Sequence, residues 1–140
     1  MIRLGDLLHK TPIEEIDPND TIKQVIVMRD DLNMRKGKMV AQGSHASMAF
    51  LSSLVDNKQQ PSAIQQQWLD SSYAKICVRV SSEAELDVIF EKSKQAGLEV
   101  HLITDSGKTE FHGQLTRTCL AIGPDYSSKI DPITGELKLL

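Results

Sequence analysis

The segment QVIVMRDDLNMRKGKMVAQGSHASMAF, residues 24–50, decides the fold because a strand pattern changes there into a helix pattern. Residues 23–28 form a short run rich in Val and Ile, typical of a strand covered on both faces. A polar loop follows at residues 29–36, and a helix is predicted from about Gly37 to Asp56. In that helix small and apolar residues recur every three or four positions and form an inner stripe: Met39, Gly43, Ala46, Phe50 and Leu54. A helix that packs on the preceding strand is a unit of an α/β fold.

The rest of the chain extends this unit. A second helix is predicted from Pro61 to Leu69, a strand at residues 74–80, and a helix that Ser81 or Ser82 caps and Gly97 ends. Two further strands are predicted at residues 98–104 and 116–123, and residues 131–140 have the pattern of a turn and a short extended tail. This order predicts a compact α/β domain, residues 21–140, around a four-stranded mixed sheet, with residues 1–20 as an N-terminal appendage.

Composition and charge narrow the functional classes. The 140 residues fit one domain, and no apolar run approaches the ~20 residues that a membrane span needs. No leader pattern precedes the domain, and both cysteines lie in apolar runs, so we expect buried free thiols and a reducing cytoplasm. The net charge is −3, but residues 21–40 carry five basic and two acidic side chains, a local charge of +3. Such a patch attracts phosphate even on a neutral body.

Two features that carry chemistry follow predicted strands. Lys38, Gln42 and His45 form a second line on the first helix, at the margin of its packed face. The stretch TDSGKT, residues 104–109, forms a tight turn after the third strand. If the first and third strands are parallel neighbours, Lys38 and Asp105 fall at the same end of the sheet. Each feature alone also fits a solvated helix end or an ordinary turn.

Other chemistries lack their patterns. A phosphate-binding loop would need glycine where Leu102 stands, so a nucleoside triphosphatase is excluded. The histidines and cysteines show no metal-ligand spacing, and no G-x-S-x-G elbow presents a nucleophilic serine. We therefore do not expect a metal site.

Three blocks occur in a recognisable order and spacing: VIVMRDDLNMRKGKMVAQGSHA, AGLEVHLITDSGKT and TCLAIGPDYSSKIDPITGELKLL. Together they resemble the type II peptidyl-tRNA hydrolase family, the archaeal and eukaryotic type, over residues 23–140. The resemblance implies a four-stranded mixed sheet with helices on both faces, often as a dimer. It also implies hydrolysis, without metal or cofactor, of the ester between a peptide and the 3′-terminal ribose of tRNA.

The resemblance assigns catalytic roles to Lys38 of the G-K-x-x-x-Q helix, to Asp105 and Thr109 of the D-x-G-[KR]-T motif, and to the threonine that opens the last strand. That threonine aligns with Thr118. Thr116 is the alternative, because the segment EFHGQLTRT lacks the proline of the family's Pro-Gly-Ser-x-Thr loop. The expected substrate-binding residues are Arg35, Lys36, Gln42, His45, Lys108 and Thr116.

These residue types suit ester hydrolysis, which passes through an oxyanion. We expect Lys38 to face the oxyanion or the terminal phosphate and ribose, and Asp105, kept ionised by Lys38, to orient or deprotonate water. The two threonines would hydrogen-bond that water or the ribose hydroxyl, and Arg35 and Lys36 would contact tRNA phosphates. Two alternatives stay open: an aminoacyl-tRNA deacylase on the same fold, and a binding adaptor for RNA or protein without turnover.

Overall fold

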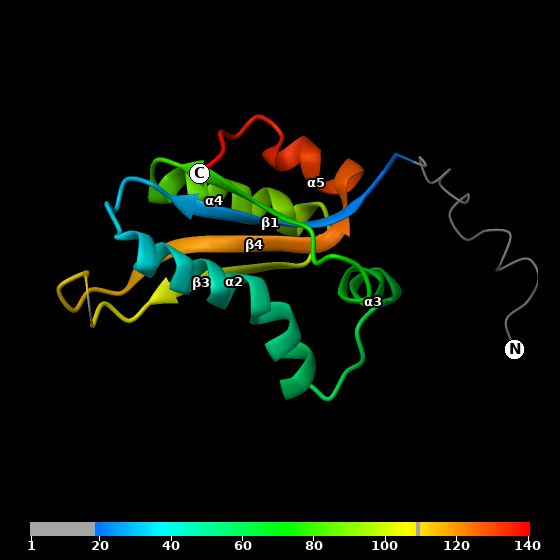
Figure 1. Cartoon of the computed structure of the whole chain (residues 1–140). Helices are drawn as coiled ribbons and strands as arrows, with labels where there is room; N and C mark the ends of the chain where they lie inside the picture. Colours follow the sequence, from blue (N-terminus) through cyan, green and yellow to red (C-terminus); the bar gives the residue numbers. More distant parts are fainter. Residues whose placement is uncertain (1–18, 109) are drawn as a thin grey trace, which may run out of the picture.

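A four-stranded mixed sheet forms the centre of the molecule, as predicted (Figure 1). The computed structural model describes residues 19–108 and 110–140. The strands are β1 (Ile22–Arg29), β2 (Lys75–Val80), β3 (Val100–Asp105) and β4 (Thr116–Tyr126), in the spatial order β2-β1-β4-β3. β1 pairs with β2 in parallel, and β4 runs antiparallel to both β1 and β3.

Helices cover both faces of this sheet, which confirms the predicted architecture. Figure 1 shows α2 (Lys36–Asp56) and α3 (Ala63–Leu69) on one side, and α4 (Glu83–Gln95) and α5 (Ser127–Thr134) on the other. Ser82, one of the two predicted caps, accepts a hydrogen bond from the Glu85 amide at the start of α4. Within the described part of the chain, no helix is long and apolar enough to cross a membrane.

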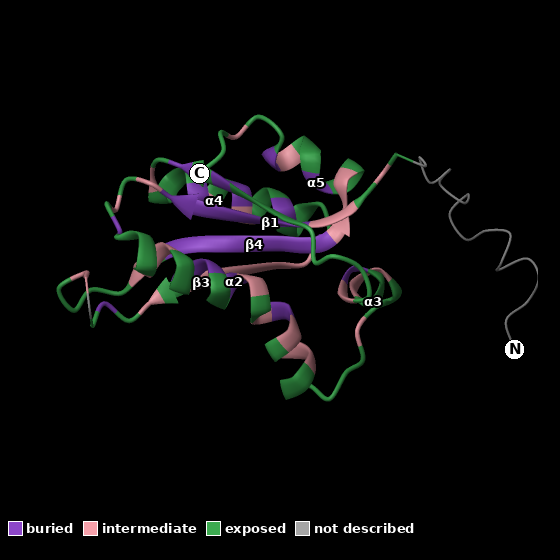
Figure 2. Cartoon of the chain, in the orientation of Figure 1, coloured by how far each residue is buried: buried purple, intermediate pink, exposed green. Residues whose placement is uncertain are grey.

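Alternation along β1 divides the core into two layers, because successive side chains of a strand point to opposite faces. Val25 and Val27 pack toward α4 and α5, with Leu86 and Ile130 among their buried neighbours. Ile26 and Met28 pack toward α2, where the core contains Ala46, Cys119 and Ala121. Gly43 lets α2 lie close to the sheet, because a Cβ there would already be 3.6 Å from Met28 Cε. Figure 2 shows β1 and β4 buried at the centre.

The prediction of a turn and an extended tail at residues 131–140 was wrong for the first part of this segment, because α5 extends to Thr134. No side chain of the segment itself caps α5. Its first turn is instead held by Asp20, whose carboxylate accepts hydrogen bonds from the Ser128 amide (3.0 Å) and hydroxyl (2.6 Å). The capping residue lies 108 positions away in the chain, so no local pattern announces the helix. The final residues do form an extended tail, in which the Leu140 amide donates to the Cys77 carbonyl.

The strand order differs from the condition considered for the sequence, in which the first and third strands are parallel neighbours. β1 and β3 are not neighbours, because β4 lies between them. Both are antiparallel to β4, so they still point in the same direction and end on the same side of the sheet. The expected meeting of the segments that follow them does not depend on direct pairing.

Three smaller expectations also change or stay open. Cys119 is buried as expected, but Cys77 is exposed, because β2 is an edge strand whose face beside α2 is uncovered. The helix α3 begins after Ser62, which caps it reciprocally with Gln65, so Pro61 precedes the cap and is not in the first turn. The boundary between an appendage and the domain stays a prediction, since residues 1–18 lie outside the described part.

Candidate active site

Lys38 and Asp105 meet at the end of the sheet where β1 and β3 finish. Lys38 lies in the first turn of α2, directly after the β1–α2 loop, and Asp105 is the last residue of β3. The Lys38 ammonium Nζ donates to Asp105 Oδ1 at 2.8 Å. The two side chains are 14% and 9% exposed, so the ion pair is shielded but open to solvent at one side.

The carboxylate of Asp105 accepts hydrogen bonds at both oxygens. Besides Lys38, Gln42 Nε2 donates to Oδ1 at 3.2 Å, and the Gly107 amide donates to Oδ2 at 2.8 Å. The Lys38 hydrogen bond is the main cause that holds the pKa of Asp105 below its ordinary value, and partial burial opposes it. Asp105 is therefore ionised at neutral pH. An ionised carboxylate accepts hydrogen bonds at about four positions, so these three donors leave capacity for one more.

Thr118 acts on this carboxylate through Gln42. The Thr118 side chain is fully buried, and its hydroxyl donates to Gln42 Oε1 at 2.6 Å. That bond fixes the amide so that its nitrogen points to Asp105. Thr116 lies two residues earlier on β4, and its hydroxyl donates to the Gln114 carbonyl instead. Of the two threonines, Thr118 is the one joined to the Asp105 network.

Gly107 shapes the turn that follows Asp105. Its φ is +81°, a region that residues with a side chain rarely adopt, and a Cβ there would lie 2.2 Å from the Gln114 carbonyl oxygen. The Gly113 amide donates to the Gly107 carbonyl at 2.8 Å. The turn is thus packed against the loop before β4 and aims its own amide at the Asp105 carboxylate.

The other predicted site residues are placed less closely. Arg35 and Lys108 are exposed near the start of α2 and the turn after β3, and Arg35 Nε lies 4.0 Å from Glu110 Oε1. Lys36 is exposed on the opposite flank of α2 from Asp105, and His45 is exposed further along the helix. Thr109 lies outside the described residues, so its predicted role is not tested.

The positive segment at residues 21–40 does not form one patch. Lys23 pairs with Asp131 at 2.6 Å, and Arg29 binds Asp31 through two nitrogens at 3.0 and 2.7 Å. Both cations are therefore neutralised within the fold. Arg35 and Lys36 remain the exposed cations at the start of α2.

The contact between Lys38 and Phe111 was not predicted from the sequence. The Lys38 ammonium lies 5.5 Å from the centre of the Phe111 ring, which packs on the core beneath α2. An aromatic face attracts a cation and so helps to hold the ammonium in place. Phe111 comes from the loop before β4, which has no periodic pattern, so its position could be found only in three dimensions.

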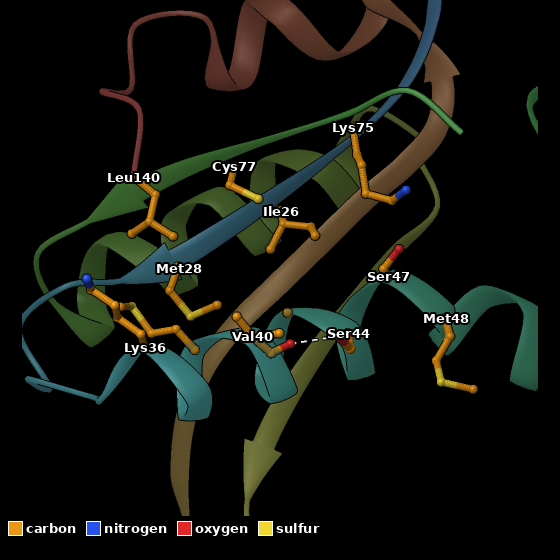
Figure 3. Close-up of a pocket in the computed structure, with 12 residues that line it drawn as sticks. Ile26, Met28, Lys36, Val40, Ser44, Ser47, Met48, Lys75, Cys77 and Leu140 are labelled. Atoms are coloured by element: carbon orange, nitrogen blue, oxygen red, sulfur yellow. Dashed lines mark hydrogen bonds between the residues drawn. The ribbon is translucent and has the colours of Figure 1, made fainter. Parts of the chain in front are cut away.

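An apolar groove lies on the other flank of α2, away from Asp105. It has a volume of about 640 Å³ and runs between α2 and the open face of β1 and β2 (Figure 3). Its walls are mainly apolar and include Met28, Val40, Cys77 and Leu140, with Lys36 and Lys75 among the lining residues. Nothing in it resembles the acid–base arrangement around Asp105. In residues 19–108 and 110–140, no three His, Cys, Asp or Glu side chains lie close enough together to hold a metal ion.

Comparison with known proteins agrees with the resemblance in the sequence. The model of the family described as Peptidyl-tRNA hydrolase PTH2 matches residues 22–140. The chain is similar to the peptidyl-tRNA hydrolase of Methanocaldococcus jannaschii, with 44% identity over 119 residues that cover 85% of this chain and 100% of that protein. It is 42% identical, over the same shares, to that of Methanothermobacter thermautotrophicus. A Saccharolobus islandicus relative of the same name is 40% identical over 85% of this chain and 99% of its own length.

Proposed function

The chain belongs to the peptidyl-tRNA hydrolase PTH2 family, and from this premise we propose that its Lys38–Asp105 pair hydrolyses the ester between a peptide and the 3′-terminal ribose of tRNA. The observation that supports this site most directly is the shielded ion pair between Lys38 and Asp105. The two residues come from two different sequence blocks that resemble the family. Neither an aminoacyl-tRNA deacylase nor a silent adaptor is favoured by the relatives, which are all named as hydrolases of peptidyl-tRNA.

Asp105 orients the attacking water. Its carboxylate keeps one acceptor position for a water molecule after Lys38, Gln42 and Gly107 have used the others. A carboxylate with a lowered pKa is a weak base, so it takes the water proton only as the bond between the water oxygen and the ester carbon forms. The ester carbon then becomes tetrahedral and its oxygen carries a negative charge. Collapse of this oxyanion breaks the bond to the ribose oxygen, which takes the proton that Asp105 accepted, so that the peptide acid is released and the carboxylate is restored.

Lys38 supplies the positive charge for that oxyanion. Its ammonium is held by Asp105 and by the ring of Phe111, so it needs little rearrangement when negative charge develops. The sequence predicts substrate contacts for Gln42 and Thr118; because both side chains are buried, we propose instead that they position Asp105. Thr109 follows Lys108 in the sequence, and we propose that its hydroxyl contacts the water or the ribose.

The tRNA binds at the start of α2. Arg35, Lys36 and Lys108 are exposed there, and they would neutralise phosphates without reading sequence, which suits an enzyme that accepts many tRNAs. The substrate makes a cytoplasmic location the natural one for this chain.

A homodimer is a further part of the proposal. Three large apolar side chains that line the apolar groove are exposed, Val40 (68%), Met48 (56%) and Leu140 (49%), and exposed apolar residues that gather at one place are typical of a protein–protein contact. We propose that a second copy covers it, and sedimentation equilibrium of Met48→Lys against the native chain measures this: the substitution shifts the protein to the monomer mass.

The activity is tested with two substrates that differ only in whether the amino group of the esterified residue is acetylated. N-acetyl-aminoacyl-tRNA and the same aminoacyl-tRNA with a free amine are supplied at equal concentration, and release of the acyl group is followed. We expect the blocked substrate to be hydrolysed and the free one to be spared. The reverse preference identifies a deacylase, and binding of tRNA without release of either identifies an adaptor.

A further inference from the structure

A second groove lies along α2, beyond the Lys38–Asp105 pair in the direction of the C-terminal end of the helix. His45 follows Lys38 by seven residues, which is about 10 Å along a helix, and His101 precedes Asp105 by four residues on the same face of β3, since strand side chains alternate. Both histidines line one groove of about 570 Å³. α2 and β3 therefore run in opposite directions past one another, as Figure 1 shows. The remaining lining residues all come from α2 and the residue after it: Met48, Ala49, Ser52, Ser53, Asp56 and Asn57.

The charges of this groove differ from those at the start of α2. Its lining contains the carboxylate of Asp56 and no lysine or arginine, and His101 Nε2 lies 2.9 Å from Glu99 Oε1. Such a lining repels phosphate, whereas hydroxyl, amide and imidazole groups hydrogen-bond neutral amides well. The exposed Arg35, Lys36 and Lys108 lie at the other end of the helix or beside it. The start of α2, with its exposed cations, therefore suits the phosphates of tRNA. The groove suits an uncharged peptide chain that extends from the ester bond in the opposite direction.

We propose that the groove between α2 and β3 is the subsite for the peptide moiety of peptidyl-tRNA. This inference rests on the proposed function of the Lys38–Asp105 pair. An extended peptide advances about 3.3 Å per residue, so the distance from Lys38 to His45 corresponds to about three residues. A substrate with one amino acid does not reach the histidines, and a substrate with four does.

The main chain of β3 adds to this subsite. β3 is the outer strand on this side, and within the described residues it pairs only with β4. The Gly123 amide donates to the Glu99 carbonyl at 2.8 Å. By the alternation of an antiparallel ladder, the main-chain groups of Val100 and Leu102 then face away from β4. A peptide that hydrogen-bonds to such an edge is held whatever its side chains are, which suits an enzyme that releases many different peptides.

The test compares two substrates with the same tRNA and the same esterified residue, one an N-acetyl-aminoacyl-tRNA and the other a tetrapeptidyl-tRNA. The measured quantity is the ratio of kcat/KM for the long substrate to that for the short one. The variants are His45→Ala, which removes a polar group, and Ala49→Trp, which fills the groove. Lys92→Ala, an exposed residue of α4, is the control. Circular dichroism establishes that each variant is folded.

We expect the native enzyme to favour the long substrate, and His45→Ala to lower the ratio about fivefold, the effect of one lost hydrogen bond. Ala49→Trp lowers the ratio further, and Lys92→Ala leaves it unchanged. Equal rates for both substrates in the native enzyme, or an unchanged ratio in both groove variants, overturn the proposal. So does an equal loss on both substrates with a changed salt dependence, which would assign the groove to tRNA. If the native enzyme hydrolyses neither substrate, the proposed function itself has failed.

Discussion

The Lys38 ammonium lies 2.8 Å from the Asp105 carboxylate, although 67 positions separate the two residues in the chain. Two strands with the same direction create this contact, since the segments that follow β1 and β3 emerge at one end of the sheet. The pair combines a fixed positive charge with an ionised water acceptor, the two things that ester hydrolysis without a covalent intermediate requires. The predictions below test its parts.

Loss of either partner lowers the rate by a large factor. Lys38→Ala removes the charge that faces the oxyanion, and Asp105→Asn removes the negative charge that takes the water proton while keeping the shape of the side chain. We expect each to reduce kcat/KM for N-acetyl-aminoacyl-tRNA by about 10² or more, the usual cost of one electrostatic donor in a transition state. The double variant falls little further, because the two groups act as a unit. A rate within a few-fold of native for one variant removes that residue from the mechanism.

The contact with Lys38 predicts that the carboxyl group of Asp105 has a lowered pKa. The Lys38 hydrogen bond lowers this pKa, so Asp105 stays ionised at pH values where an ordinary aspartate, with a pKa of about 3.9, becomes protonated. We expect the carboxyl ¹³C signal of Asp105 to titrate below that value in the native protein and to return toward it in Lys38→Met.

The same shift predicts a dependence of stability on pH. Because the pKa in the folded state is the lower one, the pair stabilises the fold above the unfolded-state pKa of about 3.9. That contribution is lost as the pH falls through the folded-state pKa. The free energy of unfolding of the native chain should therefore approach that of Lys38→Met toward low pH, and a gap that widens in acid would contradict the assignment.

Periodicity predicted the parts of the fold that local sequence controls. The β1 pattern and the inner stripe of α2 were both visible, and they place Lys38 and Gln42 on the side of the helix that the structure shows. Features that depend on distant residues were not visible. α5 is capped by Asp20 from the other end of the chain, and β4 separates β1 from β3. Thr118 illustrates the same limit within the site: the sequence aligned it with the family threonine but left Thr116 as the alternative, and its burial behind Gln42 depends on how α2 packs on β4.

Thr118 should affect activity through Gln42. Thr118→Val keeps the volume but leaves Gln42 Oε1 without its donor, at a cost of about 1–3 kcal/mol for a buried unsatisfied acceptor. The amide then loses its fixed orientation toward Asp105, so we expect a lower kcat with little change in KM, and recovery in Thr118→Ser. Thr116→Val should have the smaller effect, because that hydroxyl bonds only to its own loop. A larger effect at residue 116 would transfer the role to that threonine.

Gly107 should be intolerant of any side chain. Gly107→Ala places a Cβ 2.2 Å from the Gln114 oxygen, so the turn must move and the amide that binds Asp105 moves with it. Gly97→Ala is the matched control, since Gly97 also has a positive φ (+74°) but has no atom within 4 Å of the added carbon. The control should lose about 1–2 kcal/mol of stability from backbone strain alone and keep its activity. Thermal unfolding and kcat/KM, measured on both variants, separate the two effects; equal activity in both would show that the turn does not position Asp105.

Arg35 and Lys36, the exposed cations at the start of α2, should make KM depend on the salt concentration. Helix starts disfavour positive charge by a few tenths of a kcal/mol. Arg35 is exposed, and among residues 19–108 and 110–140 its one ion-pair partner is Glu110, at the limit distance of 4.0 Å. If Arg35 and Lys36 contact tRNA phosphates, each alanine substitution raises KM and reduces the slope of log KM against log salt by about one unit. Lys92→Ala on α4 should leave the slope unchanged, because it lies on the other face of the sheet (Figure 1). Should the slopes of Arg35→Ala and Lys36→Ala equal that of the native chain, these two residues contact only solvent, and the phosphates must bind elsewhere.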